Sequence, residues 1–191
     1  MSPDNDTSTL RLFVAVDAPS AVREVLEALP ERLRGVTWTP AHQFHLTLRF
    51  LGDVEIARLD AIAAALARVT VEPFILPVAG VGIFPPARPP RVIWAGVGDG
   101  HPRLHQLRQR VDDAVLGAGL TELDVRTFHP HFTLGRCSDR ASAATVASFL
   151  KKHREFEAPP FRVEAFTLYQ STLALGGATH TALLRVPLAT R

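Results

Sequence analysis

Apolar residues recur along this chain with two different periods, which predict strands and helices in mixed order. The apolar run at 10–16 (LRLFVAV) is typical of a buried strand, and 44–51 (FHLTLRFL) alternates polar and apolar residues as a half-buried strand does. Apolar positions at helical spacing between them predict a helix over 19–34. Asp17 and Pro19 supply its expected cap and first-turn proline.

Proline and glycine interrupt the pattern further along. Residues 74–84 are strand-like but contain Pro77, Gly80 and Gly82, so this strand is predicted to bend or to lie at a sheet edge. The stretch PPARPP at 85–90 cannot join a hydrogen-bonded ladder. The same criteria predict further strands at 36–38, 91–97, within 126–136, at 161–172 and at 179–188, and further helices at 55–69, at 104–118 and from a cap at Asp139 to about 150.

These elements amount to roughly four helices and eight strands, without the steady strand–helix alternation of a parallel sheet. We therefore expect an α+β fold in which antiparallel sheets are covered by helices on their outer faces. No low-complexity linker divides the 191 residues, so the whole chain, 1–191, is expected to form one domain. Its polar first residues, 1–9, are expected to be a disordered tail.

Composition excludes several classes of protein. The chain is 47% hydrophobic and 21% charged, as globular proteins are, and its net charge of +2 excludes a binder held to nucleic acid by bulk positive charge. An anionic ligand must therefore meet a local cluster of cations. The single cysteine, Cys137, excludes an internal disulfide framework and a cysteine-based zinc finger. Without a secretory signal or an apolar run of about 20 residues, the protein is expected to be soluble and cytoplasmic, with no membrane partner.

One short motif occurs twice, 86 residues apart: His45-Leu46-Thr47-Leu48 in the first half and His131-Phe132-Thr133-Leu134 in the second. Each copy lies in a predicted strand, where residues i and i+2 face the same way. Each therefore presents an imidazole and a hydroxyl on one face and buries its two apolar residues. Two such strands would place two imidazoles and two hydroxyls around one cleft.

This set of groups suits in-line displacement at phosphorus. One imidazole removes a proton from the attacking oxygen and the other protonates the leaving oxygen, while the threonine hydroxyls donate to the phosphoryl oxygens. Such a site needs no metal. A metal site is the other interpretation of the same residues, because His42 and His45 form an HxxH pattern and His129 and His131 an HxH pattern.

With these motifs and their flanks, the sequence resembles the 2H phosphoesterase superfamily. It is most similar to the bacterial and archaeal 2′-5′ RNA ligase family, also described as RNA 2′,3′-cyclic phosphodiesterases. The resemblance is carried by Trp38 and by the segments RLFVAV (11–16), FHLTLRFLG (44–52), RVIW (91–94), FHPHFTLGR (128–136) and FTLYQS (166–171). It implies two similar α+β lobes whose antiparallel sheets form a V-shaped central cleft, with one motif in each lobe and the helices outside.

The resemblance also implies roles. His45 would be the general acid that protonates the departing ribose 3′ oxygen, and His131 the base that activates water, which gives a 2′-phosphate. Because the two motifs are nearly symmetric, the residues alone leave open which histidine has which role. Thr47 and Thr133 match phosphate-binding threonines, and Arg136 matches an arginine near the phosphate.

Other candidate residues are open to two interpretations. By strand parity Arg136 faces away from His131, so only a bulge or a strand end would bring it into the cleft. Arg49 shares the His45 face by the same parity and is either a second phosphate-binding cation or a solvated charge. Phe13 either stacks a base or belongs to the core, and Tyr169 is equally open.

The expected function is metal-independent hydrolysis of RNA 2′,3′-cyclic phosphate ends or small cyclic nucleotides, by a monomer without a cofactor. Joining of RNA ends through a 2′-5′ bond is a possible reverse or side activity. A binding module for RNA ends and a metal-dependent phosphoesterase are the alternatives. The PPARPP loop, with Arg88 and Arg91, either borders the cleft or is a rigid turn. Five further histidines have no motif and are expected at the surface or at helix ends: His42, His101, His105, His153 and His180.

Overall fold

A computed structural model of the chain describes residues 8–86, 89–98, 101–120, 127–174 and 177–189. Its helices are α1 (Ser20–Glu27), α2 (Leu59–Leu66), α3 (Pro102–Gly117) and α4 (Ala143–Lys152), with 3₁₀ turns at Ala41–Gln43 and Ile56–Arg58. Its strands are β1 (Thr9–Asp17), β2 (Val36–Trp38), β3 (His45–Glu55), β4 (Phe74–Ala79), β5 (Val81–Phe84), β6 (Val92–Gly96), β7 (His131–Cys137), β8 (Glu157–Val163), β9 (Ala165–Ala174) and β10 (Gly177–Pro187).

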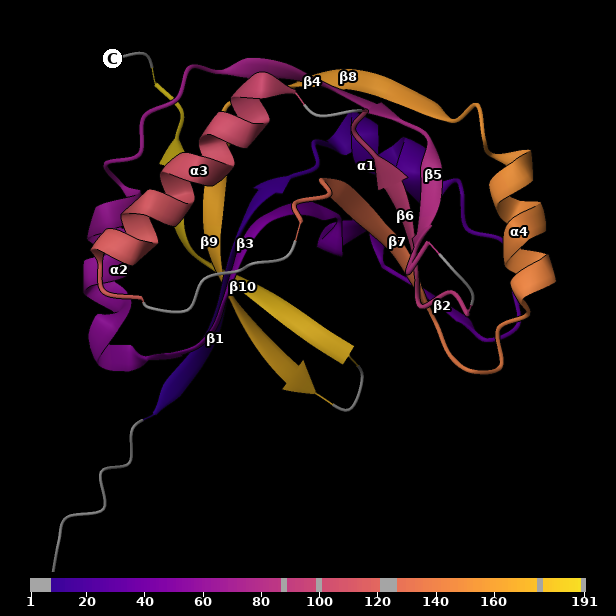
Figure 1. Ribbon diagram of the computed structural model, residues 1–191, viewed down its shortest axis with the longest axis horizontal. Helices are drawn as coiled ribbons and strands as arrows, with labels where there is room; N and C mark the ends of the chain where they lie inside the picture. The colour runs from indigo at the N-terminus through magenta and orange to yellow at the C-terminus, as the bar shows by residue number, and fades with distance from the viewer. Residues whose placement is uncertain (1–7, 87–88, 99–100, 121–126, 175–176, 190–191) are drawn as a thin grey trace, which may run out of the picture.

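The large sheet has the order β10-β9-β1-β3-β7-β6-β5, and β2 also pairs with β7. All of these pairs are antiparallel. Strands β3 and β7 are joined only at Leu46 and Phe132, so the sheet divides there into two halves. Figure 1 shows the two groups of strands with α2 and α3 outside one half and α4 outside the other. The predicted α+β fold with two antiparallel halves and outer helices is confirmed.

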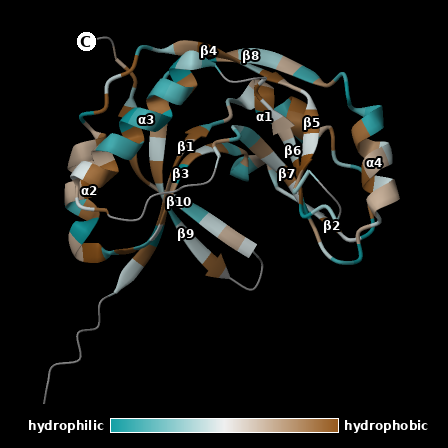
Figure 2. Ribbon diagram, in the orientation of Figure 1, coloured by the Kyte–Doolittle hydropathy of each residue, from teal (hydrophilic) through white to brown (hydrophobic). Residues whose placement is uncertain are grey.

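The core lies between the strands and their helices. Helix α3 buries Leu104, Leu107, Val111 and Val115, which recur at helical spacing, and its other face is polar (Figure 2). Full burial of each of these side chains stabilises the fold by roughly 1.5–3 kcal/mol. Strand β1 is buried from residue 12 to residue 16. Its alternate residues Leu12, Val14 and Val16 pack into the same core. No helix in the described ranges is long and apolar enough to cross a membrane.

Several element boundaries differ from those predicted. Helix α1 ends at Glu27 because Pro30 follows, where a helix cannot continue without losing a hydrogen bond. The predicted strand at 74–84 does bend: Gly80, with a φ of +77°, separates β4 from β5, which pair with different partners. Strand β8 was not predicted separately from β9, because its two adjacent prolines are poor strand residues.

The predicted cap of the last helix is wrong. Helix α4 is capped by Ser142, whose hydroxyl accepts a hydrogen bond from the Thr145 amide, and Asp139 instead accepts one from Arg91 at 2.6 Å. Arg91 therefore belongs to a surface ion pair. The predicted tail lies mostly outside the described residues, although Thr9 already pairs with Glu55 in the sheet. Arg88 of the PPARPP loop also lies outside the described residues.

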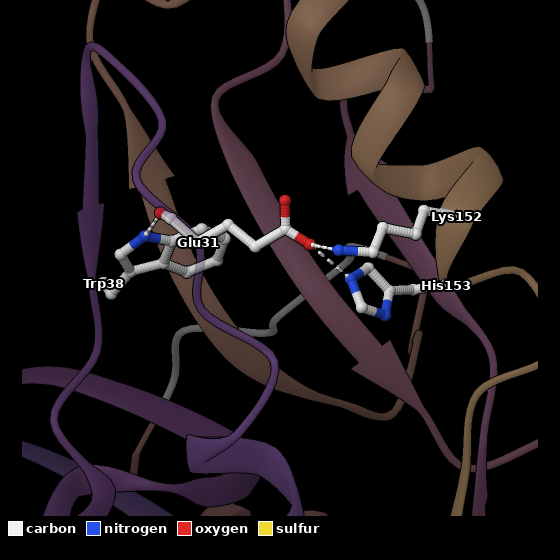
Figure 3. A network of polar contacts seen from close by, with 4 residues as sticks. All are labelled: Glu31, Trp38, Lys152 and His153. Atoms are coloured by element: carbon white, nitrogen blue, oxygen red, sulfur yellow. Dashed lines mark hydrogen bonds and ion pairs between the residues drawn. The ribbon is translucent and has the colours of Figure 1, made fainter.

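Helix α4 is attached to the loop before β2 by a polar cluster around Glu31 (Figure 3). One carboxylate oxygen of Glu31 accepts hydrogen bonds from Lys152 at 2.5 Å and His153 at 2.9 Å. The backbone carbonyl of Glu31 accepts a third from the indole of Trp38 at 2.7 Å. The Trp38 ring packs against Phe149 of α4, with 5.4 Å between centroids. This cluster holds α4 against the half of the sheet that contains the second motif.

Candidate active site

The two motifs meet where the two halves of the sheet join. His45 and His131 are the first residues of β3 and β7, and the residues that follow them, Leu46 and Phe132, form the only backbone pair between these strands. Both of those apolar side chains are fully buried, so the fold fixes the motif strands next to each other. The two imidazoles are close enough for the charge of His131 to affect the pKa of His45. Thr47 and Thr133 are half-buried, as their histidines are.

Each histidine is oriented by the backbone two residues before it. The Nδ1 atom of His45 lies 2.8 Å from the carbonyl oxygen of Gln43, and that of His131 lies 2.5 Å from the carbonyl oxygen of His129. A carbonyl oxygen only accepts hydrogen bonds, so Nδ1 donates in both residues. In the neutral imidazole the proton is then on Nδ1, and Nε2 retains the lone pair that a base requires.

Burial lowers the pKa of both imidazoles. The pKa of His45 falls to about 4, because burial outweighs the hydrogen bond to Gln43, and nearby His180 lowers it further. The pKa of His131 is lowered for the same main reason, with smaller contributions from His129 and Arg136. Both histidines are therefore neutral near pH 7 in the free protein. An anionic phosphate between them would raise both pKa values.

Aromatic rings from neighbouring strands surround each imidazole. The ring of His45 lies 4.9 Å from that of Phe13 and 5.3 Å from that of His180. The ring of His131 lies 4.9 Å from that of Phe84 and 6.3 Å from that of Trp94. The two halves therefore support their histidines in similar ways. Of these four neighbours, sequence reasoning proposed a role in the cleft only for Phe13; Trp94 belongs to the RVIW segment, and Phe84 and His180 lie in no motif.

Phe13 cannot present a face to a base. Only 3% of it is exposed, and its ring centroid lies 4.9 Å from that of His45 and 5.2 Å from that of Tyr169. Of the two interpretations offered for Phe13, the structure contradicts base stacking and agrees with a buried position, in which Phe13 packs beside His45. Tyr169 is half-buried, and its hydroxyl donates a hydrogen bond to Asp17 at 2.5 Å. Burial and this carboxylate raise the pKa of Tyr169.

Equivalent bulges interrupt both motif strands. In β7, Gly135 pairs with Ile93 and Thr133 with Trp94, so Leu134 is an extra residue. In β3, the register with β1 skips Leu48 in the same way. The alternation of faces inverts after each bulge. The structure thus contains the bulge that Arg136 needs in order to face the cleft. Arg136 is exposed, and its charge lowers the pKa of His131.

The inversion also corrects the placement of Arg49. Simple parity puts this side chain on the His45 face, but it is only 2% exposed and its Nη1 lies 3.4 Å from Oδ1 of Asp112. Asp112 belongs to α3, which covers the outer face of β3. Arg49 is thus behind the sheet and not in the cleft. The residue that follows it, Phe50, returns to the cleft face, pairs with Phe13 and is 48% exposed.

A cavity adjoins each histidine. The cavity beside His45 has a volume of about 260 Å³ and is lined by Asp17, His42, Gln43, Phe44, Tyr169, Thr179, His180 and Ala182. The cavity beside His131 is larger, about 440 Å³, and is lined by Ala79, Gly80, Val81, Phe84, Trp94, Gly96, Gly98, His105, Phe128, His129 and Pro130. His180 and His105, which were expected at the surface or at helix ends, thus line the two cavities. Within the described ranges, no three His, Cys, Asp or Glu residues are arranged to hold a metal ion.

Comparison with known proteins gives one consistent result. The structure of E. coli LigT in its apo form is similar to that of this chain, with a TM-score of 0.78 and 28% identity over 96% of this chain and 99% of LigT. LigT complexed with 3′-AMP gives a TM-score of 0.75. An Archaeoglobus fulgidus protein named RNA 2′,3′-cyclic phosphodiesterase is 33% identical over 91% of this chain and 98% of its own length.

The E. coli protein of the same name is 31% identical over 92% of this chain and 94% of its own length. The family model described as the 2′-5′ RNA ligase superfamily matches residues 13–173, a range that contains both histidine motifs and both bulges. The chain belongs to the 2′-5′ RNA ligase superfamily.

Proposed function

We propose that this protein hydrolyses RNA 2′,3′-cyclic phosphate ends to 2′-phosphates by acid–base catalysis between His45 and His131, without a cofactor. One observation carries the proposal: the two motifs meet at the junction of the sheet, and the backbone holds Nδ1 of each imidazole so that Nε2 is available for proton transfer. The relatives named RNA 2′,3′-cyclic phosphodiesterase support the same reaction.

In this mechanism His131 is the base. Its neutral Nε2 takes a proton from water, the water oxygen attacks phosphorus, and the bond from phosphorus to the ribose 3′ oxygen breaks. His45 protonates that leaving oxygen. Thr47 and Thr133 donate hydrogen bonds to the non-bridging oxygens, and Arg136 balances their charge. Each well-placed proton transfer contributes about 10²–10⁴ in rate.

His45 must gain a proton before it can act as an acid. In the free protein its pKa of about 4 leaves it neutral near pH 7. The negative charge of the bound phosphate favours the imidazolium and raises this pKa, so substrate binding and proton uptake are linked. The bound cyclic phosphate therefore helps to create the acid that cleaves it.

The test is an oligonucleotide that ends in a 2′,3′-cyclic phosphate, with the product identified as a 2′- or 3′-phosphate. His45→Ala and His131→Ala should each lower kcat by about 10² or more, given the usual size of acid–base contributions. His153→Ala removes an imidazole at the end of α4 and is the matched control. A 3′-phosphate product, or full turnover in both cleft variants, would contradict the mechanism.

A sulfur-substituted substrate separates the two roles. When sulfur replaces the 3′ oxygen, the leaving group no longer needs a proton, because thiols are much stronger acids than alcohols. The His45→Ala variant should then recover most of its lost rate, and the His131→Ala variant should not. Recovery in His131→Ala instead would exchange the two assignments.

The alternatives give different results in the same assay. A metal-dependent phosphoesterase would lose activity in EDTA, and a binding module would retain the cyclic end without converting it. The monomeric state, the cytoplasmic location, and the choice between RNA ends and small cyclic nucleotides stay predictions.

A further inference from the structure

We propose that Asp17 is a positioning residue, which holds a fixed negative charge beside His45 and stabilises the imidazolium that forms there during the reaction. This inference rests on the proposed function, in which His45 transfers a proton, and it assigns a role to a residue outside both motifs. It holds for either role of His45, because an acid begins the reaction as the imidazolium and a base is converted to it.

The strand register places Asp17 directly opposite His45. Asp17 is the last residue of β1 and His45 the first residue of β3, and the two are paired in the sheet. Side chains of directly opposed residues lie on one face of a sheet, with Cβ atoms about 4.5–5.5 Å apart. Since Val16 packs into the core, the next residue of β1, Asp17, faces the cleft. Both Asp17 and His45 line the cavity of about 260 Å³.

Two hydroxyls of β9 hold the carboxylate of Asp17 in place. Its Oδ2 accepts a hydrogen bond from Thr167 at 3.0 Å, and its Oδ1 accepts one from Tyr169 at 2.5 Å. Thr167 is buried and the Tyr169 ring is stacked on Phe13, so packing fixes both donors. Burial and the carboxylate raise the pKa of Tyr169, against smaller opposing effects of Thr167 and Arg185, so this hydroxyl stays a donor. Both donors are neutral, so they orient the carboxylate without cancelling its charge.

Two common roles of an aspartate do not apply to Asp17. The predicted cap of the first helix is wrong, because α1 has Pro19 at its N-cap and no side-chain hydrogen bond there. In a Ser-His-Asp triad the carboxylate accepts the hydrogen bond of the imidazole Nδ1. Here the carbonyl oxygen of Gln43 takes that place beside Nδ1 of His45. Asp17 therefore acts on His45 through its charge and does not hold the ring.

Asp17 opposes the other influences on the His45 imidazole. Burial lowers the pKa of His45 to about 4, so that about one imidazole in a thousand is protonated at pH 7. His180 of β10 and His131 of β7 lower this pKa further, whereas Asp17 raises it. His42, from the 3₁₀ turn, also lines the cavity and acts on His180. Among the described residues that line this cavity, Asp17 is the only one with a carboxylate.

The expected effect of this charge follows from its position. An opposite charge about 4–6 Å away changes a pKa by about 1–3. Asp17 is exposed, and solvent screens exposed charges, so the lower end is expected. Without the charge, the pKa of His45 should fall by about 1. The limb of the pH profile that depends on His45 should then move by about one pH unit to lower pH.

The experiment compares pH profiles of kcat/KM for an oligonucleotide with a 2′,3′-cyclic phosphate end. Asp17→Asn keeps the size of the side chain and removes its charge, so one limb should move to lower pH. If His45 is the acid, the alkaline limb moves and kcat/KM falls about tenfold above pH 6.5; if it is the base, the acidic limb moves. Asp53→Asn makes the same change at the far end of the β1–β3 pair, and this control should keep the wild-type profile.

The position of the limbs separates an electrostatic role from a structural one. A loss of activity that is equal at every pH, with both limbs at their wild-type positions, would overturn the inference. Tyr169→Phe keeps the aromatic ring and removes one hydrogen bond from the carboxylate, so it should move the same limb by a smaller amount. This variant takes over the test if Asp17→Asn does not fold, and a wild-type profile would then overturn the inference.

An NMR titration of the His45 imidazole needs no turnover. It is recorded with adenosine 2′-phosphate present, and the resonance is assigned by its loss in His45→Ala. The midpoint should lie about one pH unit lower in Asp17→Asn than in the wild type and should be unchanged in Asp53→Asn. An unchanged midpoint in Asp17→Asn would refute the role of Asp17. Failure of the wild type to consume the cyclic end would instead refute the proposed function.

Discussion

Replacing Arg49 with methionine should leave catalysis intact, because the bulge in β3 turns this side chain away from the cleft. Its guanidinium lies 3.4 Å from the carboxylate of Asp112 at the outer face of the sheet. Arg136 occupies the cleft face of β7 after the equivalent bulge. Arg49→Met and Arg136→Met remove the same charge from opposite faces, so together they test where each arginine acts.

The buried ion pair sets the expected size of the effect on stability. Asp112→Ala leaves the charge of Arg49, only 2% exposed, without this carboxylate. Loss of one partner from a buried ion pair costs about 3–5 kcal/mol. Since the Asp112 side chain is 26% exposed, the lower end is expected, about 3 kcal/mol. At about 2–4 °C per kcal/mol for a chain of this size, Tm should fall by roughly 6–12 °C.

Arg49→Met should be milder. Methionine fills much of the space of the arginine stem, and Asp112 still accepts a hydrogen bond from Arg108 at 2.7 Å. In the Arg49→Met background, Asp112→Ala should cost clearly less than it does alone, because the attraction between the two charges is already absent. This difference is the coupling energy of a double-mutant cycle, with an expected size of about 0.5–3 kcal/mol.

Thermal unfolding and kcat/KM measured on the same samples complete the test. Arg136→Met should lower kcat/KM by about tenfold or more, because it removes charge stabilisation at the phosphate. Arg49→Met should stay within about twofold of the wild type. If folded Arg49→Met lost as much activity as Arg136→Met, the inversion of faces at the β3 bulge could not be correct.

Three further predictions follow from the same contacts. Catalysis needs one cleft imidazole protonated and the other neutral. Burial lowers the pKa of both below 6.5 in the free protein, so kcat/KM should fall about tenfold for each pH unit above pH 6.5. Glu31→Gln should lower Tm at neutral pH but not at acidic pH. The hydrogen bonds from Lys152 and His153 lower the pKa of Glu31, so its stabilisation is present above the ordinary carboxyl value of 4.5 and is lost as the pH falls through the lowered pKa. Gly135→Ala would place a Cβ atom 2.9 Å from the Trp38 ring, and thermal unfolding should show a loss of roughly 1–3 kcal/mol.

The elements that could be predicted from the sequence are those in which apolar residues follow one pattern, a buried run or a helical spacing, along the whole element. The run at 10–16 and the helical spacing from Leu104 onward correspond to β1 and α3 within a few residues, because burial on one side decides both. Alternation also predicted that His45 and His131 lie in strands, and the structure places each at the start of its strand. Prolines obscured β8, whose pairing with β4 depends on a partner far away in the sequence.

The two arginines show where pattern reasoning stops. Parity counted from His45 put Arg49 in the cleft, and parity counted from His131 put Arg136 outside it. One extra residue in each strand reverses both results. Nothing in the sequence of either strand marks the bulge, since it is defined by the register with a partner strand. The choice between the two interpretations of Phe13 stayed open for a related reason, because its neighbours Tyr169 and His180 come from strands more than 150 residues away.

The two bulges lie at equivalent positions of β3 and β7 but are followed by different residues, so the two sides of the cleft differ in charge. After its bulge β3 presents Phe50, whereas β7 presents Arg136. The cation lowers the pKa of His131 and favours the neutral imidazole that a base requires. On the other side, the carboxylate of Asp17 acts on His45 in the opposite direction and favours its protonated form, although burial and the nearby His180 outweigh it in the free protein. The motifs alone leave the acid and the base interchangeable, and the proposal that His45 is the acid rests on this difference: a cation lies near His131, and a carboxylate lies near His45.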